Sequence, residues 1–382
     1  MGWFGRKAEA AAPERKASAT ARLTMGAGGG RTVWGPRDEP ALVRMGFLAN
    51  PIGFRAVKLI AEAASALPLV LVQGGERLEA HPVLALLARP NSGQGRAELL
   101  EALVAQVLLS GDGYVECVPD LEGGPGGLHV LRSDRVSVVP GEDGWPVAYE
   151  YAVGARKVRL PAERVCHVRG FHPQDDHYGL SPMQAAAAAV EVHNAASRWS
   201  KALLDNAARP SGALVYAGPD GAVLSQSQFD RLQGELEANH AGARNAGRPM
   251  LLEGGLDWKP MGFSPSDMEF RAVKEAAARE IAVAFGVPPM ILGIPGDATY
   301  ANYAEANRAF YRMTVLPLAG RVLGRLSGWL SSLCGETFEV AVDVDGVTAL
   351  ASERDSQWQR VTAATFLTDD EKRRLLGLPV GD

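Results

Sequence analysis

The segment His167–His177 carries the densest group of side chains that could bind a metal ion. Its sequence, HVRGFHPQDDH, offers His167 and His172 together with a terminal Asp-Asp-His run. Imidazole and carboxylate groups ligate catalytic metals when they converge rigidly. This segment runs from a predicted strand end into a loop, which favours a polar loop with satisfied histidines. The sequence therefore predicts no metal and no cofactor, and a metal-dependent hydrolase centred here is an alternative.

Two further patterns could be mistaken for catalytic motifs. The Gly-Leu-Ser run that ends at Ser181 resembles part of a nucleophile elbow, but Pro182 follows it and suits the first position of a helix. Ser181 is therefore interpreted as a helix N-cap. Asp343 and Asp345 flank one valine at a strand end and are expected to bracket a turn. The chain contains no phosphate-binding G-x-x-x-x-G-K-S/T loop, and we predict that it is not an enzyme.

Composition limits the size, the partners and the compartment of the protein. The 382 residues suit two or three packed regions, and the net charge of −5 shows no overall basic face for DNA. The three cysteines have no metal-ligand spacing and indicate a reducing compartment. The most apolar stretch, Leu59–Val72, is interrupted by Glu62 and Pro68 and is too short to span a bilayer, so no membrane association is predicted.

Residues 1–44 are predicted to be a disordered basic arm. They are rich in Ala, Gly, Arg and Lys, and six basic residues between Arg6 and Arg31 face only two glutamates. Such a charge run is either a solvated tail or an arm that contacts nucleic acid or a neighbouring subunit. The pattern favours the tail, and a nucleic-acid-binding module that uses this arm is an alternative function.

The region that follows is predicted to combine helices with a meandering sheet. Helical periodicity covers 54–66, 81–87 and 97–109, and a strand covers 69–72. Between residues 114 and 168, short apolar runs alternate with Gly/Pro clusters, including the turn at 123–127. These patterns indicate an α+β fold.

Two long helices are predicted around a small insert. Ser181-Pro182 and Ser264-Pro265 both suit helix starts, for helices over about 183–207 and 267–285. The insert contains strands and a helix capped by Ser225 and Gln228. Alanine runs at 185–189 and 276–278 would let helices approach closely, either within one chain or between neighbouring copies.

A proline-rich loop and a kinked helix come next. The segment 286–302 contains three prolines and cannot be a continuous helix. A long helix is predicted from Tyr303 to about Leu333, with a kink at Pro317. A strand at 338–344 and two short helices follow, the second capped by Thr368 and Glu371.

The order of these parts resembles the portal proteins of tailed double-stranded-DNA phages, in the short branch typical of long-tailed phages and gene transfer agents. The matching stretches are HPVLALLARPN (81–91), LLSGDGYVE (108–116), CHVRGFHPQDDHYGLSPM (166–183), NAGRPMLLEGGLDWKPMGFSPSDMEF (245–270), AREIAVAFGVPPMILG (278–293), YANYAEANRAFYRMTVLPL (300–318) and FLTDDEKRRLLGLP (366–379). They run through most of the chain.

The resemblance implies an architecture for each part of the chain. A wing would cover 45–180, and two stem helices would cover 181–211 and 264–286. A clip at 212–263 would separate these helices, and a tunnel loop would cover 287–302. A kinked tunnel helix with a wing strand would cover 303–350, and a crown 351–382. The resemblance also implies a dodecameric ring at one capsid vertex, assembled in the bacterial cytoplasm, through which double-stranded DNA is packaged and ejected.

The resemblance further implies partners and site residues. The partners would be the terminase large subunit, the head–tail adaptor and the major capsid protein. The implied residues fall into three groups: Asp297, Thr299, Tyr300 and Asn302 in the tunnel loop; Lys201, Lys274 and Arg279 toward the stem lumen; and Arg231, Glu235, Arg244 and Arg248 for docking at the clip. A different head–tail connector or structural ring protein is the alternative within the same class.

Overall fold

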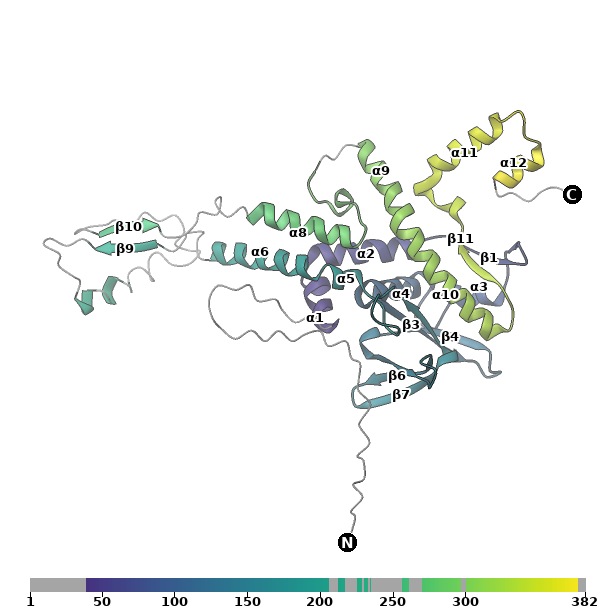
Figure 1. Ribbon diagram of the computed structural model, residues 1–382, viewed down its shortest axis with the longest axis horizontal. Helices are drawn as coiled ribbons and strands as arrows, with labels where there is room; N and C mark the ends of the chain where they lie inside the picture. Colours follow the sequence, from purple (N-terminus) through teal and green to yellow (C-terminus); the bar gives the residue numbers. More distant parts are fainter. Residues whose placement is uncertain are drawn as a thin grey trace, which may run out of the picture.

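In the computed structural model, a central body of helices and small sheets carries a pair of projecting helices and a separate short helical unit (Figure 1). The fold confirms the predicted α+β class. The structure describes residues 39–205, 212–216, 225–228, 230–232, 234, 256–260, 270–296 and 300–376.

Ordered structure begins earlier than the sequence predicts. Helix α1 (Glu39–Val43) continues into a π-helical turn at Arg44–Leu48, so the prediction of disorder up to residue 44 is wrong for its last six positions. Ala41 and Leu42 are buried, and Leu42 joins the main core. The sequence prediction missed this helix, because the Ala-, Gly- and Arg-rich composition of the preceding residues dominates the pattern.

The main core lies between α2 (Pro51–Ser65), α4 (Arg96–Ser110) and α10 (Leu316–Cys334). Asn50 begins α2, because its Oδ1 accepts hydrogen bonds from the backbone N–H groups of Ile52 (3.0 Å) and Gly53 (2.9 Å). Its Nδ2 also donates to Asn194 Oδ1 (2.9 Å), which joins this cap to one of the projecting helices.

Three small sheets surround this core, and two of them occupy residues 112–169, where the sequence predicts one meandering sheet. The first has the strand order β11-β1-β2, the second β4-β3-β8, and the third β5-β6-β7. The strands are β1 (Leu69–Gln73), β2 (Glu76–Leu78), β3 (Asp112–Pro119), β4 (Pro125–Leu131), β5 (Val136–Pro140), β6 (Pro146–Val153), β7 (Arg156–Pro161), β8 (Val165–Arg169) and β11 (Glu339–Val342). Strand β8 returns to β3 and leaves β5–β7 as a separate meander, so the single-sheet prediction is wrong. Helix α3 (Pro82–Ala88) lies near β4.

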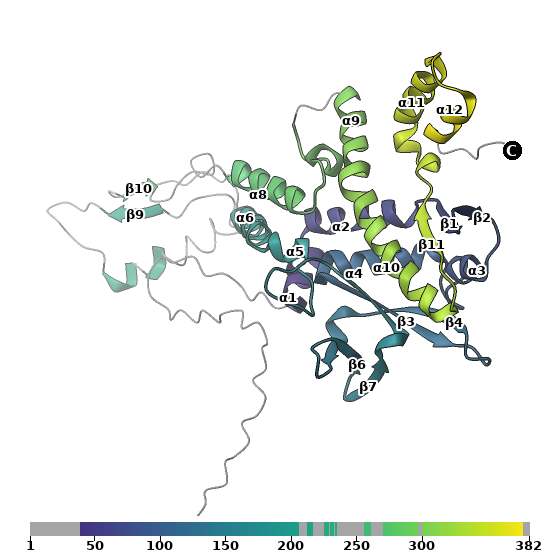
Figure 2. The same ribbon diagram turned by 45° about the vertical axis from the view of Figure 1, so that its right-hand side comes forward.

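The projecting pair consists of α6 (Ala187–Asp205) and α8 (Phe270–Ala284), which lie side by side in both views (Figures 1 and 2). Ser181 Oγ accepts a hydrogen bond from the Gln184 backbone N–H (2.9 Å), which confirms the predicted cap. The first helix is not continuous, since α5 (Pro182–Ala185) ends at Ala186 before α6 starts. The start of the second helix at Ser264-Pro265 lies outside the described residues.

The insert between these helices is described only in part. Strands β9 (Gly212–Tyr216) and β10 (Leu256–Pro260) lie where the sequence predicts strands, and the structure shows that they pair antiparallel. Ser225 N–H donates to Gln228 Oε1 (2.9 Å) at the start of a helical turn, which confirms the predicted cap. The strand predicted at 248–252 lies outside the described residues.

A π-helical turn produces the kink in the long helix. Helix α9 (Tyr300–Phe310) passes into π-helix at Tyr311–Val315 and then into α10. The Leu316 N–H donates to the Tyr311 carbonyl, one residue farther back than in an α-helix. Pro317 has no N–H for the carbonyl of the preceding turn, so a widened turn accommodates the kink that the sequence predicts there.

Two short helices, α11 (Ala351–Ala363) and α12 (Asp369–Leu375), end the described chain. Thr368 and Glu371 form the predicted capping box: Glu371 Oε2 accepts from the Thr368 N–H (2.8 Å), and Thr368 Oγ1 accepts from the Glu371 N–H (3.3 Å). We refer to residues 351–376 as the crown unit. It stands apart from the body in both views (Figures 1 and 2).

Candidate functional site

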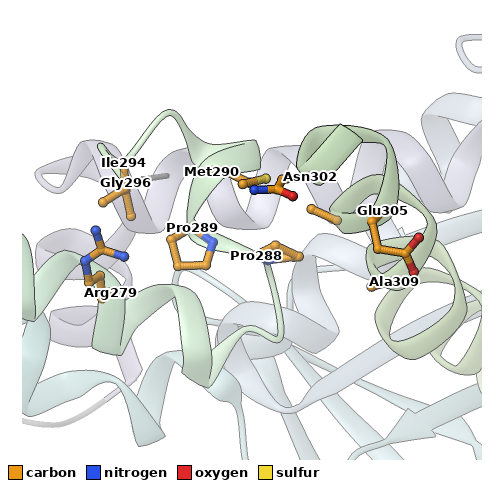
Figure 3. A pocket seen from close by; sticks show the side chains of 10 residues that line it. Arg279, Pro288, Pro289, Met290, Ile294, Gly296, Asn302, Glu305 and Ala309 are labelled. Atoms are coloured by element: carbon orange, nitrogen blue, oxygen red, sulfur yellow. The ribbon is translucent and has the colours of Figure 1, made fainter. Parts of the chain in front are cut away.

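An open groove of about 500 Å³ lies between the end of α8 and the start of α9. Its lining residues come from α8, from the proline-rich segment and from one face of α9 (Figure 3). They are Arg279, Pro288, Pro289, Met290, Ile294, Gly296, Asn302, Glu305, Ala306 and Ala309. The groove therefore brings together one predicted stem cation and one predicted tunnel-loop residue. We call it the α8–α9 groove.

Glycine and proline shape the wall of this groove. Gly286 follows α8 with a φ of 66°, a conformation that side chains disfavour, and so turns the chain sharply. A 3-10 turn at Pro289–Leu292 follows, and Gly293 (φ 75°) ends it. The segment is therefore ordered by local backbone chemistry, with the two prolines turned toward the groove (Figure 3).

Two side chains tie this segment to the helices around it. The Arg279 guanidinium donates a hydrogen bond to the Pro295 carbonyl. Thr314, in the π-helical turn, donates through Oγ1 to the Gly286 carbonyl (2.5 Å). The end of α8 and the π-helical turn between α9 and α10 are thus linked directly. Sequence reasoning missed Thr314, because only the three-dimensional kink places its hydroxyl beside Gly286.

The predicted tunnel-loop residues do not all lie in a loop. Tyr300 and Asn302 belong to the first turn of α9, so their assignment to the loop is wrong. Asn302 and Glu305 lie on the same face of α9 and reach the groove (Figure 3). Asp297 and Thr299 lie outside the described residues. The helix starts early because the sequence from 300 to 310 is rich in alanine and contains no glycine or proline.

The rim of the groove carries opposite charges. Arg279 lies at one end and Glu305 at the other (Figure 3). Glu305 also forms an ion pair with Arg308, one turn along α9. Because guanidinium and carboxylate groups are both present, the groove is not a concentrated cationic site for phosphates.

The three predicted stem cations occupy different places. Lys201 is exposed on α6, Lys274 is half-buried on α8, and Arg279 reaches the groove. Lys274 affects the protonation of His193 on α6. Burial lowers the pKa of His193 below 6.5, and the positive charge of Lys274 lowers this pKa further. His193 Nδ1 lies 3.2 Å from Asn50 Nδ2, next to the cap of α2.

Of the predicted clip-docking residues, the structure describes Arg231 alone. It is exposed in the helical turn that follows Ser225. Glu235, Arg244 and Arg248 lie outside the described residues.

The histidine-rich segment forms a structural junction. His167 Nε2 donates to Asp112 Oδ1 (2.7 Å), and both side chains are only 6% exposed. The Gly179 N–H donates to both oxygens of the same carboxylate (3.0 and 2.9 Å), just before the stem begins at Ser181. His172 instead accepts a hydrogen bond from the Gln174 N–H (3.1 Å). Within the described ranges, no three His, Cys, Asp or Glu side chains converge as metal ligands.

Comparison with known proteins identifies the class that this fold represents. The family model described as phage portal protein matches residues 51–377. The chain therefore belongs to the phage portal protein family, and the predicted resemblance is confirmed.

Individual proteins are similar to this chain over most of its length. A protein of Rickettsia bellii, which carries no functional description, is 39% identical over 338 residues and covers 86% of this chain and 87% of its own length. The probable portal protein of Streptomyces phage phiC31 is 27% identical over 287 residues, covering 70% of this chain and 61% of its own. A chain in the neck of a native gene transfer agent particle, solved with C12 symmetry, is 65% identical, covers 93% of this chain and 97% of its own, and superposes with a TM-score of 0.72.

No helix in the described part of the chain is both long and apolar enough to cross a bilayer.

Proposed function

We propose that twelve copies of this chain form a ring at one vertex of a gene-transfer-agent-like particle, and that double-stranded DNA enters and leaves through the ring. One observation carries this proposal: a chain 65% identical over 93% of this sequence belongs to the neck of such a particle solved with C12 symmetry. A ring needs a heterologous interface, in which one flank of each copy meets the other flank of its neighbour.

The stem alanines support close packing on two sides. Within 185–189, Ala186, Ala187 and Ala189 are buried, whereas Ala185 and Ala188 are exposed. Within 276–278, the last two residues are buried and the first is exposed. The sequence left packing within one chain and packing between copies both open. The buried alanines serve the chain itself, and the exposed ones leave a small-residue surface for a neighbouring stem.

The charges suit a channel through which DNA slides. Each contact between a cation and a DNA phosphate adds binding affinity and must be broken when the DNA moves. A strongly cationic lumen would therefore hold the DNA in place. The chain has a net charge of −5, and the lining of the α8–α9 groove includes both the cation Arg279 and the anion Glu305. We expect Asn302 and Tyr300 to make passing polar contacts, with Asp297 opposing adhesion.

The partners follow from this role. We propose that the clip, including Arg231, receives the terminase large subunit and later the head–tail adaptor. The wing would contact the major capsid protein. Assembly would take place in the bacterial cytoplasm, and the chain would act without catalysing a reaction. His172→Ala with Asp176→Ala tests this last point: we expect unchanged assembly and unchanged DNA content.

Deletion of the gene in a particle-producing strain tests the proposal as a whole. We expect capsids without DNA, and recovery of DNA-filled particles when the intact chain is supplied. A chain lacking 212–263 should assemble no filled particles, because the docking region is missing. DNA-filled particles in the complete absence of the chain would contradict the proposed function.

A further inference from the structure

Most outer edges of the sheets in the body are closed by another part of the chain. An edge strand presents unpaired N–H and C=O groups unless something covers them. Four edge strands, β4, β5, β8 and β11, each have a backbone group bonded to a residue outside their sheet: the Leu128 N–H to the Pro90 carbonyl (2.7 Å), the Val138 N–H to the Tyr178 hydroxyl (3.0 Å), the His167 carbonyl to Arg325 Nε (3.2 Å), and the Val340 N–H to Ser327 Oγ (2.8 Å). The edge strand β2 has only three residues.

Strand β7, which has six residues, differs from these edges. It is an outer strand of the sheet β5-β6-β7 and lies at the border of the body in both views (Figures 1 and 2). Its first four residues, 156–159, are all exposed, and within the described part of the chain none of its backbone groups bonds to a residue outside the sheet. Alternate residues of an antiparallel edge strand turn their N–H and C=O groups away from the sheet. Another extended chain can therefore pair with β7.

The side chains of β7 differ between the two faces of the sheet. Val158 and Leu160 lie on the face that forms the small core of this sheet, and Lys157 and Arg159 lie on the opposite face. Leu160 is buried, whereas Val158 is 36% exposed. Lys157 Nζ lies 2.6 Å from Glu150 Oε1, and Arg159 has no carboxylate within ion-pair distance among the residues that the structure describes. A chain placed beside β7 therefore meets cations on one face and an uncovered valine on the other.

Charge indicates which kind of chain can pair with this edge. Arg156, Lys157 and Arg159 place three cations within four residues. A second copy of β7 would bring like charges opposite one another, which destabilises a sheet. Nucleic acid can neutralise the cations but has no groups spaced to pair with a strand, and the Glu150 carboxylate lies among these cations. An extended acidic segment of a protein satisfies both the backbone groups and the cations.

We propose that β7 binds an extended segment of a different protein as an additional strand, and that acidic and apolar residues alternate in this segment. The acidic residues face Lys157 and Arg159, and an apolar residue covers Val158. Main-chain hydrogen bonds give such a contact its affinity, and the alternate side chains give it specificity. The edge is open in the single chain, so this binding does not depend on ring formation and goes beyond the proposed function.

Peptide binding to the full-length protein tests the backbone pairing. The probe is a fluorescein-labelled peptide in which glutamate and valine alternate, and fluorescence anisotropy measures its Kd. Two further probes carry N-methyl groups on all the glutamate amides or on all the valine amides, which keeps the charges but removes one set of backbone donors. Only one set of amides faces β7, because the two sets point to opposite sides of a strand. We expect saturable binding of the unmodified probe and a Kd raised by about tenfold or more for one methylated probe alone.

Charge reversal on the strand provides an independent readout. Arg156→Glu with Arg159→Glu should raise the Kd of the unmodified probe by about tenfold or more, since like charges then face each other across the contact. Arg89→Glu with Arg373→Glu reverses two exposed cations outside this sheet and should leave the Kd unchanged. Urea unfolding of both double variants checks that they fold.

Three results would overturn the proposed strand contact: no saturable binding of the unmodified probe, equal binding of the two methylated probes, or a short DNA duplex that binds to these cations while the peptide does not. Each of these results leaves the proposed ring standing, because ring formation is measured on the protein without peptide. Intact peptide binding by a chain that forms no rings would instead contradict the proposed function alone.

Discussion

The body and the crown unit both contain amphipathic helices, but they differ in where their stability arises. Helix α10 buries Leu326 and Leu330 completely against the sheets and α2. Helices α11 and α12 bury no residue. The body is therefore stabilised by its own core, whereas the contacts that hold the crown unit are polar and exposed. Substitutions in the two regions should therefore differ in their effect on the free energy of unfolding.

The largest contrast is expected between two leucines. Leu326→Ala removes a fully buried side chain and should lower the free energy of unfolding of the single chain by about 2–5 kcal/mol. Leu375→Ala removes one that is 53% exposed and should change it by no more than about 0.5 kcal/mol. Urea unfolding of unassembled protein measures both. Equal losses would remove the distinction between the two regions.

The junction that Asp112 forms with β8 and with Gly179 should give the next largest effect. Asp112→Ala leaves the buried Gly179 N–H and His167 without their acceptor, and should cost about 1–3 kcal/mol. Asp134→Ala is the control, because its ion pair with Arg132 is exposed and worth at most about 1 kcal/mol. Thermal unfolding compares the two variants. A loss no larger for Asp112→Ala than for Asp134→Ala would show that the carboxylate does not secure the junction.

A smaller effect is expected where the π-helical turn at Tyr311–Val315 contacts the end of α8. Thr314→Val keeps the shape of the side chain but removes the donor to the Gly286 carbonyl, at a cost of about 0.5–1.5 kcal/mol. Thr314→Ser keeps the hydroxyl and should recover most of this loss. Thr362→Val, on the exposed side of the crown unit, should have no measurable effect in the unassembled chain.

The smallest effect is a pH dependence at the base of the stem. The pKa of His193 is lowered from 6.5, so the unfolded chain takes up a proton there more readily than the folded one. Its stabilising contribution is complete above pH 6.5 and is lost as the pH falls from 6.5 through the folded pKa. His193→Gln should flatten the decline of the melting temperature below pH 6.5. An unchanged slope would argue against a buried neutral imidazole at this position.

Local chemistry made much of this fold predictable. The caps at Ser181 and Thr368 and the kink near Pro317 follow from side chains and backbone groups within one helical turn. Strand segments were also visible as apolar runs between glycines and prolines. These features do not depend on distant parts of the chain.

Features that depend on distant contacts were not predicted. The return of β8 to β3 divides the expected meander into two sheets, and no local pattern encodes that pairing. The partner of His167 was not predicted either, because Asp112 lies 55 residues away in the sequence and only the pairing of β3 with β8 brings the two side chains together. The α8–α9 groove likewise depends on the turn between two helices, which places Arg279 of α8 and Asn302 of α9 in the lining of one groove.

The proposed function requires that this chain closes into a ring of defined size. Native mass spectrometry of the purified full-length protein, at rising concentration, tests this requirement directly. We predict a species of twelve chains that appears without a growing series of open oligomers, since a heterologous interface with the right rotation closes. A protein that stays monomeric at every concentration, or that extends into chains of indefinite length, would contradict it.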